Sequence, residues 1–162
     1  MIITDFITEE FITTSVQSED KDELFAELVE LLSRGMHTRH TDIDSETILS
    51  AITEREEKMS TGIGHGVAMP HGKTDAVNDL CGVLGISKRG IDYEALDGEP
   101  VHIIFMLIAP SSSPGPHIKA LQRIASLLKT PGCFDKLCDA RSASEAWQIL
   151  RDEEDRFDDD HD

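Results

Sequence analysis

Two short apolar runs limit the folds open to this chain more than any other feature. They cover 80–87 and 101–109, are rich in valine, isoleucine, leucine and phenylalanine, and have turn residues on both sides. Runs of this length and composition are typical of buried strands. Between them, Lys88-Arg89-Gly90 and Leu96-Asp97-Gly98 provide turn chemistry. We therefore expect both runs in the middle of one sheet.

Helical periodicity precedes the two runs. One helix is expected to start at Asp20, with Glu23 at the capping-box position, and to end at Gly35. A second is expected to start at Asp44 or the next residue, and it carries Arg55 close to its C-terminal end. Their apolar faces are formed by Leu24, Phe25, Leu28, Leu31 and Leu32 in the first helix and by Ile48, Leu49 and Ile52 in the second.

A third helix is expected after the second run. Pro116 suits its first position, which puts His117 in its first turn, and apolar residues recur at helical spacing from 118 to 128. A short helical turn at 134–137 and a last helix over 144–151 follow. Helices packed on a sheet form an α/β domain, and 162 residues suit one domain. The sequence therefore predicts a single α/β domain over 1–151, with a mixed central sheet flanked by helices.

The C-terminal residues 152–162 are strongly acidic. They contain eight acidic residues against one arginine, Arg156. Blocks of like charge repel one another and stay solvated. We expect a disordered acidic tail, and a docking role for a basic partner has no support beyond the charge.

Composition excludes several classes of function. The net charge of −17 argues against nucleic acid and anionic membranes as partners, because such binding draws on clustered lysine and arginine. The longest apolar run spans ten residues, about half of what a membrane helix needs, and the N-terminus does not resemble a signal peptide. Three cysteines without a Cys-x-x-Cys pair suit reduced thiols rather than a zinc site. These observations predict a cytoplasmic protein without membrane insertion.

The segment 53–73 carries the clearest chemical signal, because it ends a helix, runs through a glycine loop and presents His71 between a proline and a glycine. Neutral imidazole is a competent nucleophile near neutral pH. Gly62, Gly64, Gly66 and Gly72 can turn backbone N–H groups toward an anion, and Arg55 can bind a phosphate bidentately. His117, at a helix N-terminus, lies where an anion is favoured. Together these residues predict a site for a doubly charged phosphoryl group.

The other histidines provide weaker alternatives. His65 competes with His71 for the reactive role, but between two glycines it is equally compatible with a surface residue. His37 and His40 have a spacing that suits a metal, yet the sequence offers no evident third ligand. His102 lies in an expected strand, where we expect a hydrogen-bonded core or edge histidine.

Three motifs together resemble a known family. They are Arg55-Glu56, Ser60-Thr61-Gly62-Ile63-Gly64 and Val67-Ala68-Met69-Pro70-His71-Gly72-Lys73. They look like the signature of enzyme IIA of the fructose–mannitol class of the bacterial phosphoenolpyruvate-dependent phosphotransferase system, which includes the nitrogen-type regulatory proteins. The similarity extends through Ala109-Pro110 and His117-Ile118-Lys119, so that only the acidic tail falls outside it.

The resemblance implies a phosphocarrier. The histidine phosphocarrier protein HPr, or its nitrogen-branch counterpart, would donate a phosphoryl group to His71. Arg55 and His117 would stabilise that phosphate, with Thr61 and the glycines Gly62, Gly64 and Gly72 around it. The next partner would be a IIB domain or a regulated target protein, and a homodimer is left open. The scheme needs no cofactor and no metal, and it makes the chain a phosphoryl-transfer intermediate rather than a stand-alone catalyst.

Two departures and two rival functions stay open. The loop before His117 reads Ser-Ser-Ser-Pro-Gly-Pro, more proline-rich than the resemblance leads us to expect. The chain carries no IIB or IIC sequence, which favours the regulatory branch. One rival is a non-catalytic module that senses a phosphorylated metabolite through the glycine loop and Arg55. The other is a metal-dependent hydrolase that uses His65, His71 and His117.

Overall fold

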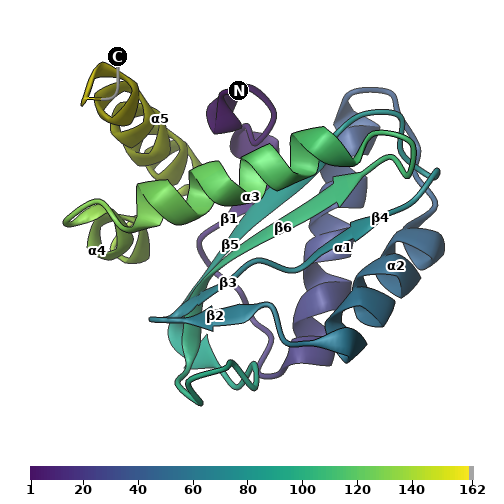
Figure 1. Ribbon diagram of the computed structural model, residues 1–162, viewed down its shortest axis with the longest axis horizontal. Helices are drawn as coiled ribbons and strands as arrows, with labels where there is room; N and C mark the ends of the chain where they lie inside the picture. Colours follow the sequence, from purple (N-terminus) through teal and green to yellow (C-terminus); the bar gives the residue numbers. More distant parts are fainter. Residues whose placement is uncertain (161–162) are drawn as a thin grey trace.

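The computed structural model describes residues 1–160, and its core is one mixed sheet with helices on both faces (Figure 1). The strand order is β1-β5-β6-β3-β2, and β4 also pairs with β6. The strands are β1 (Ile12–Thr13), β2 (Gly62–Gly64), β3 (Val67–Ala68), β4 (His71–Lys73), β5 (Cys81–Ile91) and β6 (Val101–Ala109). The α/β class and the mixed central sheet predicted from the sequence are thereby confirmed.

The two apolar runs form the centre of the sheet. β5 and β6 pair antiparallel, with Leu84 opposite Phe105, and nearly every side chain of β6 is buried. β5 is longer than the expected run, because it continues through 88–90 to Ile91, which pairs with Val101 after an irregularity in the register. The prediction of a turn at 88–90 was therefore wrong. The segment forms an irregularity inside β5, between the pairs Ile86–Ile103 and Ile91–Val101, and Gly90 takes a φ of 89° within it.

Within residues 1–160, five α-helices surround the sheet: α1 (Lys21–Thr38), α2 (Ser45–Lys58), α3 (Pro114–Leu128), α4 (Cys133–Cys138) and α5 (Ala143–Asp160). Two short 3-10 helices of the same range, η1 (Ile3–Asp5) and η2 (Glu9–Phe11), precede β1. α3 crosses one face of the sheet against β6, whereas α1 lies behind it against β5 (Figure 1). α2 packs on α1 and β4. Asp20 and Asp44 cap α1 and α2 as expected, each accepting a hydrogen bond from a backbone N–H three residues on.

The end of α1 differs from the expectation. Gly35 lies inside the helix, which continues to Thr38. A Cβ on Gly35 would lie 2.3 Å from a ring carbon of Phe11. Glycine is needed here because a phenylalanine from η2 lies directly on the helix, so the prediction that Gly35 ends the helix was wrong.

The acidic C-terminal segment is helical where the structure describes it. α5 runs through Asp160, well past the expected end at 151, and residues 161 and 162 lie outside the described part. Glu154 is 1% exposed and accepts hydrogen bonds from the backbone N–H groups of Ile3 (2.7 Å) and Thr4 (2.8 Å) and from Arg123 of α3 (2.7 Å). The expectation of disorder therefore does not hold for 152–160, because buried acidic residues pair with distant parts of the chain.

Candidate functional site

His71 opens β4 at the edge of the sheet and is half-buried. Its place is fixed by the parallel pairing with β6, where it lies opposite Leu107, and by the hydrogen bond from the Leu107 N–H to the Pro70 carbonyl (3.0 Å). Nδ1 of His71 lies 2.9 Å from the carbonyl oxygen of Met69. A carbonyl oxygen only accepts, so Nδ1 carries the proton and Nε2 carries the lone pair. The sheet and this contact leave Nε2 as the nucleophilic atom.

Gly72 lets β4 approach helix α2. A Cβ at Gly72 would lie 3.1 Å from the carbonyl carbon of Ala51 and 3.2 Å from the nitrogen of Ile52. Both are backbone atoms, which give way less readily than a flexible side chain. The glycine after His71 therefore serves close packing of a strand against a helix, and this packing brings the last turn of α2 beside the imidazole.

His117 reaches the same place from the other face of the sheet. It lies in the first turn of α3, is 6% exposed, and its ring centroid is 5.7 Å from that of His71, with the ring planes tilted by 35°. The N-terminal end of a helix has a partial positive charge that favours anions. The structure thus brings together the two histidines that the sequence placed 46 residues apart.

Arg55 lies in the last turn of α2, and its Nη1 donates to the carbonyl oxygen of Met59 at 3.1 Å. The last carbonyl groups of a helix have no partner within the helix, so this contact both satisfies one of them and holds the guanidinium. Arg55 has further N–H donors that this bond does not use.

These residues line one cavity of about 480 Å³ between α2, β4 and α3. Its lining consists of Ala51, Glu54, Arg55, Lys58, His71, Gly72, Lys73, His117 and Ile118. Three cations therefore face the cavity against one carboxylate, in a chain whose net charge is −17. This reversal of the overall charge balance suits a ligand with two negative charges.

The electrostatics keep His71 neutral. Burial lowers the pKa of His71 below its ordinary value, and the nearby positive charges of Arg55 and His117 lower it further, against the raising effect of the Met69 hydrogen bond. Burial is the largest of these causes, and both burial and the charge of Arg55 penalise the imidazolium form. At neutral pH the ring is therefore a nucleophile with its lone pair on Nε2.

Other residues of the predicted phosphate site lie elsewhere. Thr61, Gly62 and Gly64 are absent from the lining of the cavity that His71 opens onto. The Thr61 hydroxyl bonds to Tyr93 at 2.7 Å, and a Cβ on Gly62 would lie 2.7 Å from Ala95. The structure gives Thr61 and Gly62 packing and hydrogen-bonding roles around the hairpin of β2 and β3, while Gly72 alone of the predicted glycines borders the cavity.

The remaining histidines do not converge with His71. His65 has a φ of 57°, lies in the turn between β2 and β3 and lines a different cavity. Nδ1 of His102 bonds to the Ser87 carbonyl at 2.9 Å, as a strand histidine with a partner should, and His37 bonds to Asp42. Within residues 1–160 no group of three or more histidine, cysteine, aspartate or glutamate side chains is arranged to hold a metal ion. The histidine set of the hydrolase hypothesis is thus divided between two places.

Lys58 was not singled out from the sequence, and Lys73 and Glu56 were named there only as motif residues without a role. Lys58 and Lys73 add positive charge to the cavity. Glu56 lies one residue after Arg55, and both its oxygens are engaged in a buried cluster. Nothing in the sequence around Glu56 indicated that its carboxylate is buried.

A comparison with protein-family models places this geometry in context. Residues 5–153 match the family described as "Phosphoenolpyruvate-dependent sugar phosphotransferase system, EIIA 2". The chain belongs to this family. The resemblance seen in the motifs is thereby confirmed, and the family match extends to residue 153, just inside the acidic C-terminal segment.

Curated relatives and a solved structure agree with the family match. The chain is 35% identical over 150 residues to a fructose-specific EIIABC component of Bacillus subtilis, and it covers 23% of that protein. It is 32% identical over 150 residues to a nitrogen regulatory protein of Bradyrhizobium diazoefficiens, and it covers 95% of that one. Each match covers 93% of this chain. The crystal structure of a nitrogen regulatory protein IIA-Ntr from Neisseria meningitidis superposes with a TM-score of 0.81 at 28% identity, over 91% of this chain and 98% of that one. None of the helices within 1–160 is long and apolar enough to cross a membrane.

Proposed function

We propose that this enzyme IIA family member is a phosphohistidine carrier in a phosphoenolpyruvate-dependent phosphotransferase relay. His71 accepts a phosphoryl group from the histidine phosphocarrier protein HPr or its nitrogen-branch counterpart. The group then passes to a IIB domain, or its presence regulates a target protein. The proposal places the chain in the cytoplasm together with its donor.

One observation carries this proposal: a neutral imidazole, held by the Met69 carbonyl through Nδ1, lines a cavity with three cations. Phosphoryl transfer needs positioning and charge neutralisation more than covalent assistance from the protein. In the accepting step, a bond forms between Nε2 of His71 and phosphorus while the donor's N–P bond breaks and its electron pair returns to the donor imidazole. The proton on Nδ1 stays in place, bonded to Met69.

Arg55, His117 and the two lysines have a supporting role in this scheme. Positive charge at a transferring phosphoryl group stabilises the charge spread over its oxygens. Arg55 is held at the rim by Met59, and the His117 ring lies next to the acceptor ring. We expect these groups to set the rate of transfer, whereas His71 alone supplies the bond-forming atom.

The relay assay tests the proposal directly. Labelled phosphoenolpyruvate, enzyme I and the phosphocarrier protein are incubated with wild type, His71→Ala and His65→Asn. We expect label on wild type and on His65→Asn but not on His71→Ala, and we expect the label to be lost in acid and kept in base. His65→Asn is the matched control, because it removes an exposed histidine outside the cavity and asparagine tolerates its positive φ. Label on His71→Ala would refute the assignment.

A second candidate function rests on the same cavity. Three cations around 480 Å³ also suit the reversible binding of a phosphorylated metabolite without modification of His71. No label with any cognate donor, combined with binding of a sugar phosphate that depends on Arg55, would favour this sensing module over the carrier.

A further inference from the structure

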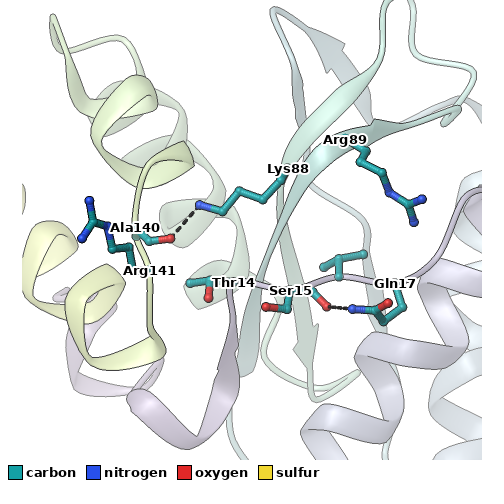
Figure 2. Close-up of a pocket in the computed structure, with 8 residues that line it drawn as sticks. Thr14, Ser15, Gln17, Lys88, Arg89, Ala140 and Arg141 are labelled. Carbon is teal, nitrogen blue, oxygen red and sulfur yellow. Dashed lines mark hydrogen bonds between the residues drawn. The ribbon is translucent and has the colours of Figure 1, made fainter.

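A second cavity lies away from His71, and it too is basic (Figure 2). It has a volume of about 430 Å³ and is lined by Thr14, Ser15, Val16, Gln17, Lys88, Arg89, Ala140 and Arg141. Three of these side chains are cationic and none is acidic. Acidic residues outnumber basic ones by 32 to 15 in this chain, so a lining with cations only stands against the overall composition.

In the part of the chain that the structure describes, the two arginines of this cavity have no carboxylate partner. Within residues 1–160, five arginines pair with acidic residues, namely Arg34, Arg39, Arg123, Arg151 and Arg156. The described ion pairs and hydrogen bonds include no partner for Arg89 or Arg141, and Arg55, the remaining arginine, lines the cavity of His71. Guanidinium groups bind phosphate and carboxylate bidentately. Arg89 and Arg141 are therefore available to an external anion, as Arg55 is at the first site.

Lys88 is held in the middle of the lining. Its ammonium donates to the carbonyl oxygen of Ala140 at 2.6 Å and to that of Cys138, at the end of α4. An ammonium group has three N–H donors, so one is left for a ligand. In Figure 2 Lys88 lies between Arg89 on one side and Arg141 on the other. The positive charge is thus spread along the cavity rather than gathered at one point.

Side-chain hydroxyls complete the polar lining. Thr14 and Ser15 each contribute one, and neither hydroxyl is hydrogen-bonded within the described chain. The backbone N–H groups of this stretch are already used: that of Ser15 donates to Thr13, that of Val16 to Ile86, and that of Gln17 to Glu27. Contacts to a ligand would therefore come from the cations and the hydroxyls.

The two cavities are far apart. His71 lies opposite Leu107 of β6, and Leu107 lies opposite Gly82 of β5. From Gly82 to Lys88 the strand advances six residues, which corresponds to about 20 Å at the usual rise of a strand. A ligand in the second cavity does not contact the phosphoryl site.

We propose that this cavity binds an elongated organic anion with an oxyanion group, phosphate or carboxylate, at each end. The two arginines on either side of Lys88 match such a ligand, because one small oxyanion contacts only part of the cationic lining. The volume lies in the range of small-molecule sites. This site does not depend on the proposed carrier function, and ligand binding alone tests it.

Titration of ¹⁵N-labelled protein with fructose 1,6-bisphosphate, followed by amide chemical shifts at low salt, tests the proposal. Citrate and inorganic phosphate are titrated in parallel. We expect saturable shifts at 14–17, 88–89 and 140–141, an affinity that falls with added salt, and binding of inorganic phosphate weaker by about tenfold or more. If the bisphosphate binds and citrate does not, the two end groups of the ligand are phosphates. If citrate binds equally well, the site also accepts carboxylates. Both outcomes support the proposal.

Variants separate a specific site from general charge. Arg89→Gln with Arg141→Gln is expected to weaken bisphosphate binding by about tenfold or more, since it removes two charge-assisted contacts. Arg34→Gln is the matched control, because it removes the same charge from an exposed arginine on α1. Amide spectra establish that both proteins are folded. The proposal fails if no shifts occur, if they are confined to the surroundings of His71, if Arg34→Gln weakens binding equally, or if inorganic phosphate binds as tightly as the bisphosphate.

Discussion

Nδ1 of His71 lies 2.9 Å from the carbonyl oxygen of Met69, two residues earlier in the same loop. Pro70 between them has its own carbonyl bonded to the Leu107 N–H of β6. The loop is therefore fixed to the central strand on one side and to the imidazole on the other. Such an arrangement sets the tautomer of the ring before any donor arrives.

The first prediction concerns which nitrogen is modified. Phosphorylation is expected at Nε2, because Nδ1 holds the proton that it donates to Met69. Long-range ¹H–¹⁵N correlation spectra of phosphorylated protein with labelled histidine distinguish the two positions. A phosphoryl group on Nδ1 would mean that the Met69 contact is broken before transfer.

The second prediction concerns pH. Burial and, after it, the positive charges of Arg55 and His117 lower the pKa of His71 below the ordinary histidine value of 6.5. A lowered folded-state pKa means that the neutral ring persists below pH 6.5 and is lost only as the pH falls through the lowered value. We therefore expect phosphoryl acceptance to hold from neutral pH through pH 6.5 and to decline only as the pH falls through the lowered pKa of His71, together with the stability that the neutral ring contributes. Rapid-quench rates on either side of 6.5 measure this.

Arg55→Gln provides the complementary measurement. Removing the guanidinium takes away one of the causes that lower the pKa of His71, so this pKa is expected to rise toward its ordinary value. An NMR titration of the His71 ring protons, compared between wild type and the variant, reads the shift directly. A pKa that stays the same or falls in Arg55→Gln would show that the two groups do not interact as the geometry indicates.

The third prediction separates His117 from His71. The His117 ring is 5.7 Å from the His71 ring, and under the proposed function it stabilises the phosphoryl group while His71 supplies the bond-forming atom. His117→Ala is expected to slow acceptance by about 100-fold, the scale found when one group that stabilises transition-state charge is removed, while the final extent of labelling is kept. Single-turnover labelling with excess donor gives both quantities. Complete loss of labelling in a folded His117→Ala protein would contradict this division of roles.

Local patterns were sufficient for the centre of the fold, and they also supplied the residues proposed for the site. The buried runs at 80–87 and 101–109 became β5 and β6, and the expected caps at Asp20 and Asp44 begin α1 and α2. Hydrophobic periodicity and helix capping depend on residues that are close in sequence, so both can be recognised from the sequence. The pairing of His71 with His117, by contrast, depends on β4 and α3 meeting across the sheet.

Errors arose where distant contacts override local composition. The charge of 152–162 predicted disorder, yet Glu154 bonds to Ile3 and Thr4, about 150 positions earlier in the chain. Such a contact leaves no local periodic signal. Phosphate binding by the loop glycines stays a prediction, and the structure adds a packing role: Gly62 makes room for Ala95 and Gly72 for the backbone of α2. Glycine content alone does not distinguish close packing from ligand binding.

The fourth prediction concerns the buried cluster around Glu56, which supports the C-terminal end of α2. Glu56 is 8% exposed and accepts hydrogen bonds from Thr61 N (2.9 Å) and Tyr93 (3.1 Å), and it pairs with Lys21 of α1 at 3.1 Å. Burial is the largest cause that raises the pKa of Tyr93 well above its ordinary value. The Tyr93 hydroxyl therefore keeps its proton and donates it in the hydrogen bond to Glu56. Glu56 therefore joins α1, α2 and the start of β2 directly behind Arg55.

Removal of this carboxylate leaves several buried groups without their acceptor. Glu56→Ala is expected to lower the free energy of unfolding by about 3 kcal/mol, the scale for losing one partner of a buried ion pair. Tyr93→Phe removes the hydrogen bonds of the Tyr93 hydroxyl to Glu56 and to Thr61 and is expected to cost about 2 kcal/mol. Glu57→Ala is the matched control, since Glu57 is exposed, and a change within about 0.5 kcal/mol is expected. Urea unfolding curves measure all three. Equal stability of Glu56→Ala and Glu57→Ala would show that the cluster does not hold the end of α2, and the position of Arg55 would then need another cause.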